Sequence, residues 1–269
     1  MDTSTLTIVA VVTLGFIVLV DVVVIKLYVQ RLQSRLKQPT EAHKTEFLSL
    51  VSHYFLTPLA IIRGNIAEVM DPASKNLSET DREKLYLNIQ VNTNRLLLLI
   101  QNVITTSSID QNTLKVSPNA VSIIELIDNA IADVHAESVQ KNLVIKFNRP
   151  QLVVDQARID AEKIRQSLIN ILSNAVKFTG SGGSVVITLS EVDQMYKIQI
   201  ADSGIGISPD EVKKLFTRFH RGTSYLNMDY EGVGLGLYIA KYLIEINGGT
   251  ISVQSAVHKG TEVTVWLKK

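Results

Sequence analysis

The stretch that says most about the fold is Asn170-Ile171-Leu172-Ser173-Asn174-Ala175-Val176-Lys177-Phe178, in a predicted helix at about residues 160–178. With about 100° between successive residues, Asn170, Asn174 and Lys177 fall within about 60° of one another. The opposite side of this helix is apolar and forms the predicted core face, with Ile164, Leu168, Ile171, Leu172 and Ala175.

The polar stripe has two interpretations. It can be a solvated helix face. It can also be a ligand site, because asparagine is a poor helix former and two of them on one mid-helix stripe cost stability. An amide oxygen is a suitable ligand for Mg²⁺, and Lys177 can neutralise phosphate. The helix alone leaves both interpretations open.

A second polar segment follows at the end of a predicted strand, Ile200-Ala201-Asp202-Ser203-Gly204-Ile205-Gly206. A carboxylate placed there can accept a hydrogen bond from the exocyclic amine of adenine. Gly204 and Gly206 would let a flat base lie against bare backbone. Taken alone, the Asp-x-Gly-x-Gly pattern is also often only a turn.

The third segment is Gly232-Val233-Gly234-Leu235-Gly236-Leu237, which runs into a helix ending near Asn247. Glycines ahead of a helix expose backbone N–H groups to an anion. The spacing and late position differ from the Rossmann fingerprint, and no Gly-Lys-Ser/Thr follows, which excludes a Walker A loop. The polar stretch 222–231 before this segment suits a mobile lid.

Around these segments the pattern predicts helices near 121–138, 209–216 and 235–246. It predicts strands near 143–147, 184–190, 195–201, 249–254 and 261–268. We therefore expect a two-layer α/β sandwich, a sheet with helices on one face, beginning near residues 110–118.

The preceding residues predict a helical hairpin. Between residues 46 and 70 apolar residues recur at helical spacing, at Phe47, Val51, Phe55, Ile62, Ile66 and Val69. Thr80-Asp81-Arg82-Glu83 fits a capping box that opens a second helix, whose apolar seam is Leu85, Ile89, Leu96, Leu99 and Val103, with Asn92 interrupting it. One hairpin cannot bury two such stripes, whereas two hairpins can, as a four-helix bundle. This predicts a homodimer.

The first helix of the hairpin contains Ser52-His53-Tyr54-Phe55-Leu56-Thr57-Pro58. His53 falls on the side opposite the apolar stripe and is expected to face solvent. Pro58 removes a helical hydrogen bond and is expected to kink the helix. A single exposed histidine is usually only a surface residue, but a nucleotide site later in the same chain favours a functional role.

The N-terminus predicts a membrane anchor. The residues from Leu6 to Ile25 are almost wholly apolar, only Asp21 among them is ionisable, and about 20 helical residues cross the hydrocarbon core. Basic residues follow at Lys26 and Arg31, which places the C-terminal side in the cytoplasm. No basic residue precedes the run, which disfavours a cleaved signal peptide.

The composition argues against two other features. The net charge of +1 gives no electrostatic case for nucleic-acid binding, and the absence of cysteine excludes disulfides.

In this order and spacing, residues 40–269 resemble the sensor histidine kinases of two-component systems. Ser52-His53…Thr57-Pro58-Leu59 is similar to the phospho-acceptor box, and Asn170–Phe178 is similar to the N box. Asp202–Ile207 and Gly232–Leu237 are similar to the two glycine boxes, and Phe216–Phe219 to the F box. The tail of that domain is matched by Gly248-Gly249 and Gly260-Thr261.

The resemblance implies a GHKL (Bergerat) ATP-binding fold that uses ATP and Mg²⁺. In it Asn174 coordinates Mg²⁺ with Asn170 and Lys177 beside the phosphates. Asp202 binds adenine with Gly204 and Gly206 around it, and the triphosphate is covered by Gly232, Gly234, Leu235 and Gly236.

The resemblance also implies the transfer residues. His53 takes the phosphoryl group and Arg221 stabilises its charge. The phosphate then passes to an aspartate of a response-regulator receiver domain, and Thr57 orients water for dephosphorylating that partner.

The apolar run, the change of pattern near 110–118 and the resemblance together predict three parts: an anchor at 1–29 in the bacterial plasma membrane, a linker and dimerisation domain at 30–112, and a catalytic domain at 113–269. Two departures weaken the kinase expectation. The family usually has an acid directly after the histidine and an arginine two residues later, but this chain has Tyr54 and Leu56. A phenol is a far weaker proton acceptor than a carboxylate.

Two alternatives therefore remain. One is a relative with weak kinase activity that acts as a scaffold or phosphatase. The other is a GHKL-type ATPase, in which a glutamate activates water where this chain has Asn170.

Overall fold

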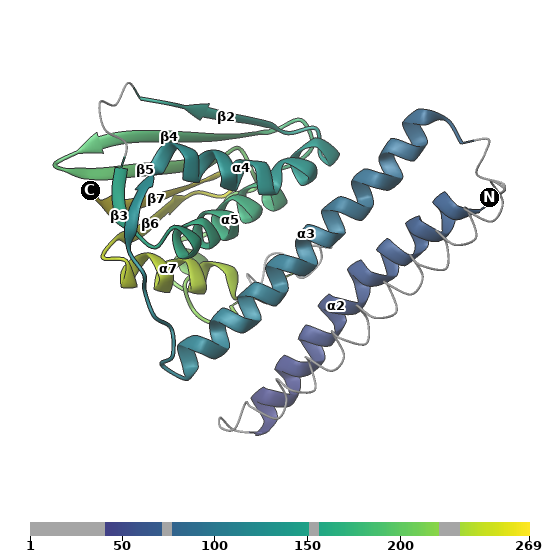
Figure 1. Cartoon of the computed structure of the whole chain (residues 1–269), viewed down its shortest axis with the longest axis horizontal. Helices are drawn as coiled ribbons and strands as arrows, with labels where there is room; N and C mark the ends of the chain where they lie inside the picture. The colour runs from purple at the N-terminus through teal and green to yellow at the C-terminus, as the bar shows by residue number, and fades with distance from the viewer. Residues whose placement is uncertain (1–40, 72–76, 151–155, 221–231) are drawn as a thin grey trace, which may run out of the picture. The chain divides into compact units, whose positions relative to one another are not determined.

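The computed structural model of the chain describes residues 41–71, 77–150, 156–220 and 232–269, although the side chains of 41–51 and 53 lie outside this description. The chain divides into two compact units, Met1–Leu85 and Tyr86–Lys269. The elements of both are drawn in Figure 1.

The first unit holds helix α2, Glu41–Met70, and the start of helix α3, Glu79–Asp110. Pro58 lies inside α2, and Phe55 is buried as its place on the apolar stripe predicts. The predicted cap of the second helix is wrong by two residues. Ser78, and not Thr80, caps α3: its hydroxyl accepts a hydrogen bond from the backbone N–H of Asp81 at 3.1 Å and donates to the Asp81 carboxylate at 2.7 Å.

The second unit is the predicted α/β sandwich. After the rest of α3 its elements are β1 (Asn119–Ser122), α4 (Ile123–Gln140), β2 (Val144–Asn148), β3 (Gln156–Ile159), α5 (Ala161–Phe178), β4 (Ser184–Val192), β5 (Met195–Asp202), α6 (Pro209–Val212), α7 (Gly236–Ile246), β6 (Thr250–Ser255) and β7 (Thr261–Lys268). Five strands form one sheet in the order β2-β4-β5-β7-β6, in which only the β2–β4 pair is parallel. Helices α4, α5 and α7 cover one face of it (Figure 1).

The core lies between that helical layer and the sheet. Alternate residues of the central strands are fully buried, as the period of two along a strand requires: Val185, Ile187 and Leu189 in β4, Ile198 and Ile200 in β5, and Val265 and Leu267 in β7. The predicted core face of α5 packs against the same core, with Ile164, Leu168, Ile171, Leu172 and Ala175 all buried.

Two features differ from the sequence expectation. Strands β1 and β3 form a separate antiparallel pair in which Asn119 lies opposite Ile159, and four-residue strands are too short to show a period. The predicted helix at 209–216 is helical only over Pro209–Val212 and continues as turns.

The predicted membrane anchor from Leu6 to Ile25 lies outside the described residues. None of the helices within the described ranges is long and apolar enough to span a membrane.

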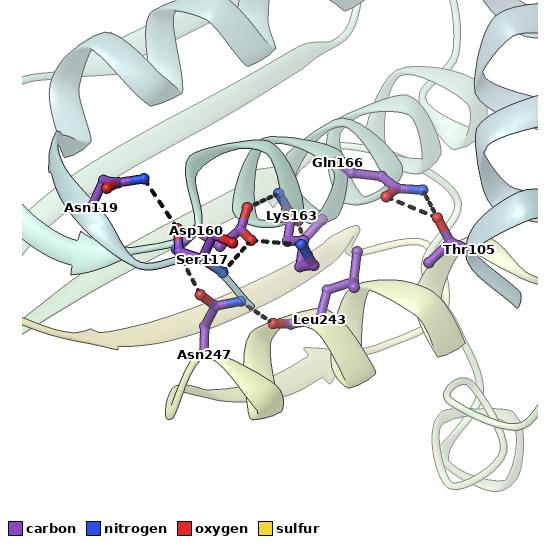
Figure 2. A network of polar contacts seen from close by, with 9 residues as sticks. Thr105, Ser117, Asn119, Asp160, Lys163, Gln166, Leu243 and Asn247 are labelled. Carbon is purple, nitrogen blue, oxygen red and sulfur yellow. Dashed lines mark hydrogen bonds and ion pairs between the residues drawn. The ribbon is translucent and has the colours of Figure 1, made fainter. Parts of the chain in front are cut away.

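A polar network fixes the beginning of α5 (Figure 2). The Asp160 carboxylate caps the helix by accepting a hydrogen bond from the backbone N–H of Lys163 at 3.2 Å. It also accepts from the Lys163 ammonium at 2.5 Å and from the backbone N–H of Ser117 at 2.9 Å. The backbone N–H of Asp160 donates to the Asn247 side chain at 2.8 Å. Asp160 thus joins the start of α5 to the segment after α3 through its buried carboxylate, and to the end of α7 through its backbone N–H.

Replacing Asp160 with alanine is expected to lower the free energy of unfolding by about 2 kcal/mol at neutral pH, because a cap and a charge-assisted hydrogen bond are lost. Burial alone would raise the pKa of Asp160, but hydrogen bonds from Lys163 and Ser117 outweigh it and hold that pKa below its usual 3.8. A lowered carboxyl pKa stabilises the fold above the unfolded-state pKa, and that contribution disappears as pH falls through the folded-state pKa.

Denaturant unfolding at neutral pH and at about pH 3 measures this difference. Asp160→Asn is the matched control, because asparagine still caps a helix but carries no charge. An equal loss for Asp160→Ala at both pH values would contradict the electrostatic part of the prediction.

Candidate functional site

The second and third segments singled out in the sequence both reach the C-terminal half of α5, which carries the first segment. The backbone N–H of Ile205 donates to the Phe178 carbonyl at 3.3 Å, which brings the loop after β5 to the end of α5. On the other side, a Cβ atom at Gly232 would lie 2.9 Å from the Lys177 ammonium nitrogen. A Cβ atom at Gly236 would lie 3.1 Å from the Asn170 side-chain oxygen. The segment before α7 therefore passes directly over the polar stripe of α5.

Asn170 is 2% exposed, so the solvated-face interpretation is wrong for this residue. Its amide pairs with that of Asn102 on α3: Asn102 Nδ2 donates to Asn170 Oδ1 at 2.7 Å, and Asn170 Nδ2 donates to Asn102 Oδ1 at 3.0 Å. Gln166 extends the contact by donating to Asn102 Oδ1 at 3.2 Å and to the Thr105 hydroxyl at 3.0 Å. This buried polar band was missed in the sequence, where Asn102 and Thr105 among the apolar residues of α3 are its only signal.

Asn174 and Lys177 occupy the next turns of α5, and both are half-buried. The Lys177 ammonium lies 4.7 Å from the centroid of the Phe178 ring. No described residue hydrogen-bonds the Asn174 side chain, whereas Asn170 is already paired. Of the two asparagines, Asn174 is therefore the one whose amide oxygen can meet a metal ion without first breaking a protein contact.

Asp202 ends β5 with its two carboxylate oxygens in different surroundings. Oδ1 accepts hydrogen bonds from the backbone N–H of Gly204 at 2.9 Å and of Thr261 at 3.2 Å. No described residue donates to Oδ2. Burial raises the pKa of Asp202, although the two backbone hydrogen bonds act in the opposite direction. The backbone thus holds one oxygen and leaves the other to accept a hydrogen bond from a ligand.

The loop after Asp202 has no room for side chains at its glycines. A Cβ atom at Gly204 would lie 2.5 Å from the Phe178 carbonyl oxygen. Gly206 has a φ of +67°, and a Cβ atom there would lie 1.9 Å from the Ala256 carbonyl oxygen. The loop is held in this place because the His258 N–H donates to the Ile205 carbonyl at 2.7 Å.

Replacing Gly206 with alanine is expected to lower the free energy of unfolding by at least about 2 kcal/mol, because both the backbone angle and the Ala256 backbone oppose a side chain. Gly182→Ala is the matched control. It has a similar φ of +78° but nothing within 4 Å of the added carbon, so it reports backbone strain alone. Urea denaturation of the two variants separates the effects, and equal losses would contradict the steric argument.

The segment before α7 is joined to the turns after α6. The Phe219 N–H donates to the Gly234 carbonyl at 3.0 Å, and Leu235 is buried. Arg218 forms a bidentate ion pair with Asp110 of α3, with both distances 2.8 Å. No side chain of the described residues caps the start of α7, so its first N–H groups are available to an anion.

The predicted transfer residues are only partly described. His53 lies in α2, but its side chain, like the whole of Arg221 and the polar stretch 222–231, lies outside the described residues. Thr57 follows one turn later in α2 and is half-buried. Next to His53, Tyr54 is buried and Leu56 is 66% exposed.

Comparison with known proteins assigns families to both regions. Residues 159–269 match the family of histidine kinase-, DNA gyrase B- and HSP90-like ATPases, and residues 43–112 match the His Kinase A (phospho-acceptor) domain. Together the two matches cover more than half of the chain. The circadian input-output histidine kinase CikA of Synechococcus elongatus is 33% identical over 236 residues, which are 86% of this chain and 31% of that protein.

Two solved structures share the fold. Full-length ShkA in complex with AMPPNP has a TM-score of 0.55 at 22% identity, covering 83% of this chain and 45% of that one. Histidine kinase ThkA in complex with the response regulator protein TrrA has a TM-score of 0.52 at 23% identity, covering 82% and 60%. The chain spans less than half the length of the curated relatives it matches.

Proposed function

Because this chain belongs to the sensor histidine kinases of two-component systems, we propose that it binds Mg-ATP and phosphorylates its own His53. The observation that carries the proposal is that three groups able to bind parts of a nucleotide lie around the C-terminal half of α5. Within the described ranges these groups are Oδ2 of Asp202 and the Asn174 amide, neither of which has a hydrogen-bond partner there, and the start of α7, which has no side-chain cap there.

Each group suits one part of the nucleotide. Asp202 Oδ2 accepts a hydrogen bond from the adenine amine, while Gly204 and Gly206 leave the backbone bare beside the base. The N–H groups at the start of α7 and the segment Gly232–Gly236 face the phosphates, as helix starts do for anions. Asn174 offers an amide oxygen to Mg²⁺, and Lys177 offers positive charge. When bound, Mg²⁺ neutralises the charge that develops on the phosphates.

The transfer itself needs positioning and charge stabilisation rather than covalent help from other residues. A nitrogen of the His53 imidazole attacks the γ-phosphorus in line. The new P–N bond forms as the bond from that phosphorus to the β,γ-bridging oxygen breaks, and ADP leaves. Arg221 stabilises the charge on the transferred group. The phosphoryl group then moves from His53 to an aspartate of a receiver domain.

The same proposal covers assembly and location. Two hairpins pair as a four-helix bundle, which buries the apolar stripes of α2 and α3 in a homodimer. The apolar run from Leu6 to Ile25 anchors the chain once in the bacterial plasma membrane and contacts lipid, with the catalytic domain in the cytoplasm.

A second candidate is a relative with weak kinase activity that acts as a phosphatase or scaffold. It is favoured by Tyr54 and Leu56, which stand where the family usually has an acid and an arginine. An ATPase that uses a general base in α5 is disfavoured, because the amide of Asn170 cannot take a proton from water.

The test uses the full chain in detergent micelles with γ-labelled ATP and Mg²⁺. A label on the protein that is acid-labile and base-stable supports the kinase. Its transfer to a receiver domain supports the relay. No label, with ATP binding intact, favours the second candidate, and loss of phosphate from a phosphorylated receiver, abolished by Thr57→Ala, would then identify a phosphatase.

A further inference from the structure

The carbonyl groups at the end of α5 all have partners, and one of these partners comes from outside the nucleotide site. The Ala175 carbonyl accepts from the Thr179 N–H at 3.2 Å and from its hydroxyl at 2.6 Å. The Phe178 carbonyl accepts from the Ile205 N–H. The carbonyls between these two, at Val176 and Lys177, are taken by a lysine side chain instead of a backbone group.

That side chain is Lys141, directly after α4. Its ammonium donates to the Val176 carbonyl at 2.7 Å and to the Lys177 carbonyl at 2.6 Å. A positive charge at a helix C-terminus is favourable because the unpaired carbonyls there carry partial negative charge. Burial lowers the pKa of Lys141, while Glu137 on α4 raises it and Arg95 on α3 lowers it. The Lys141 side chain is therefore partly desolvated where it contacts the two carbonyls.

The contact lies on the backbone of the candidate site. Lys177 supplies one of the two carbonyls, and its side chain is expected at the phosphates. The next residue, Phe178, supplies the carbonyl that Gly204 packs against and that Ile205 binds. The direction of the Lys177 side chain and the position of the adenine-side loop thus both depend on the last turn of α5.

We propose that Lys141 is a positioning residue for nucleotide binding, because it holds the last turn of α5 in the geometry that Lys177 and the Gly204 loop require. This inference rests on the proposed ATP site. Lys141 itself does not touch the nucleotide. A side chain without donors at this position leaves two carbonyls without partners, and the last turn then has no fixed geometry.

The chain offers a matched control at the other end of the same helix. Lys163 also forms a short ion pair, with Asp160, and also stabilises α5. It lies 14 residues before Lys177, about 21 Å along the helix axis. Removing Lys163 is therefore expected to lower stability without moving the nucleotide site.

The experiment measures the dissociation constant of a fluorescent ATP analogue, KM for ATP, kcat and the unfolding midpoint for the full chain and its variants. Lys141→Met removes both hydrogen bonds from the side chain to α5 and is expected to raise the dissociation constant and KM by about tenfold, while kcat changes less than about twofold. Lys141→Arg, which can donate to both carbonyls, is expected to stay within about threefold of the wild type. Lys163→Met is expected to lower the unfolding midpoint only.

Several results would overturn the inference. One is wild-type affinity in Lys141→Met, and another is an equal loss of affinity in Lys141→Met and Lys163→Met, which would indicate general destabilisation. If Lys141→Met does not fold, Lys141→Gln replaces it, and wild-type affinity in that variant overturns the inference equally. If the wild-type chain does not bind the analogue, both the proposed ATP site and the inference are overturned. If the wild-type chain binds the analogue but Lys141→Met binds it equally well, only the inference is overturned.

Discussion

Replacing Asp202 with asparagine is expected to lower ATP affinity by about 100-fold while the domain stays folded. The amide oxygen of asparagine can still accept the backbone hydrogen bonds from Gly204 and Thr261. The other position then carries an NH₂ group in place of the free carboxylate oxygen. Two donors, that NH₂ and the adenine amine, would face each other. Loss of a charged hydrogen bond plus an unpaired buried donor corresponds to about 3 kcal/mol.

The same substitution, Asp202→Asn, is not expected to lower the free energy of unfolding. Because burial raises the pKa of Asp202 in the folded chain, its ionised form destabilises the fold at neutral pH. That cost is absent below the usual pKa of 3.8 and appears as pH rises through the folded-state pKa. Asp202→Asn removes the cost, so its free energy of unfolding at neutral pH should equal or exceed that of the wild type.

Two measurements check this pair of expectations: calorimetric ATP titration and denaturant unfolding. Wild-type ATP affinity should also fall more steeply on acidification than that of Asp202→Asn, because only the wild type has a carboxylate at this position to take up a proton. Unchanged affinity in Asp202→Asn would place the adenine elsewhere. A large loss of stability would instead make Asp202 a structural residue.

Replacing His53 with glutamine is expected to abolish phosphorylation of the chain while ATP affinity stays within about twofold of the wild type. An amide nitrogen is not a nucleophile for phosphorus, so no P–N bond can form. His53 lies in α2, and the candidate nucleotide site lies in the other compact unit, which is why binding should be unaffected.

His135→Gln is the control for this substitution. His135 is exposed on α4 and belongs to none of the site segments, so its variant should be labelled like the wild type. Quantifying the label on each variant after incubation with γ-labelled ATP decides the matter. A label that persists in His53→Gln would show that another residue accepts the phosphoryl group.

How far the sequence predicts this protein depends on how long each pattern runs. Helix α5 and strand β7 lie almost where the periodicity predicts them, because each shows several periods of alternating polarity. Strands β1 and β3 have four residues each, which is too short to show a period, and neither was predicted. The prediction that Thr80 caps α3 was wrong because the Ser78 hydroxyl, two residues earlier, accepts the capping hydrogen bond.

The candidate site divides in the same way. The sequence predicts which segments carry ligand groups, and the structure brings Lys177, Asn170 and the glycines beside them together. The partners of these groups could not be predicted. The Asn102–Asn170 pair joins residues 68 positions apart, and Lys141 reaches α5 from 35 positions away. Contacts of that kind depend on how helices pack, and a polar residue in an apolar stretch, such as Asn102 in α3, does not indicate which partner it meets.

The close approach of Gly206 to Ala256 also sets limits on how this loop can evolve. Gly260 stands under the same constraint, with its missing Cβ 1.9 Å from the Asp202 carbonyl oxygen, whereas Gly64 and Gly180 face open space. In a library of random variants, substitutions should accumulate at the open pair and be nearly absent at the closed pair. A side chain at Gly206 or Gly260 therefore requires the facing backbone, at Ala256 or Asp202, to move as well, and a single substitution does not produce that movement.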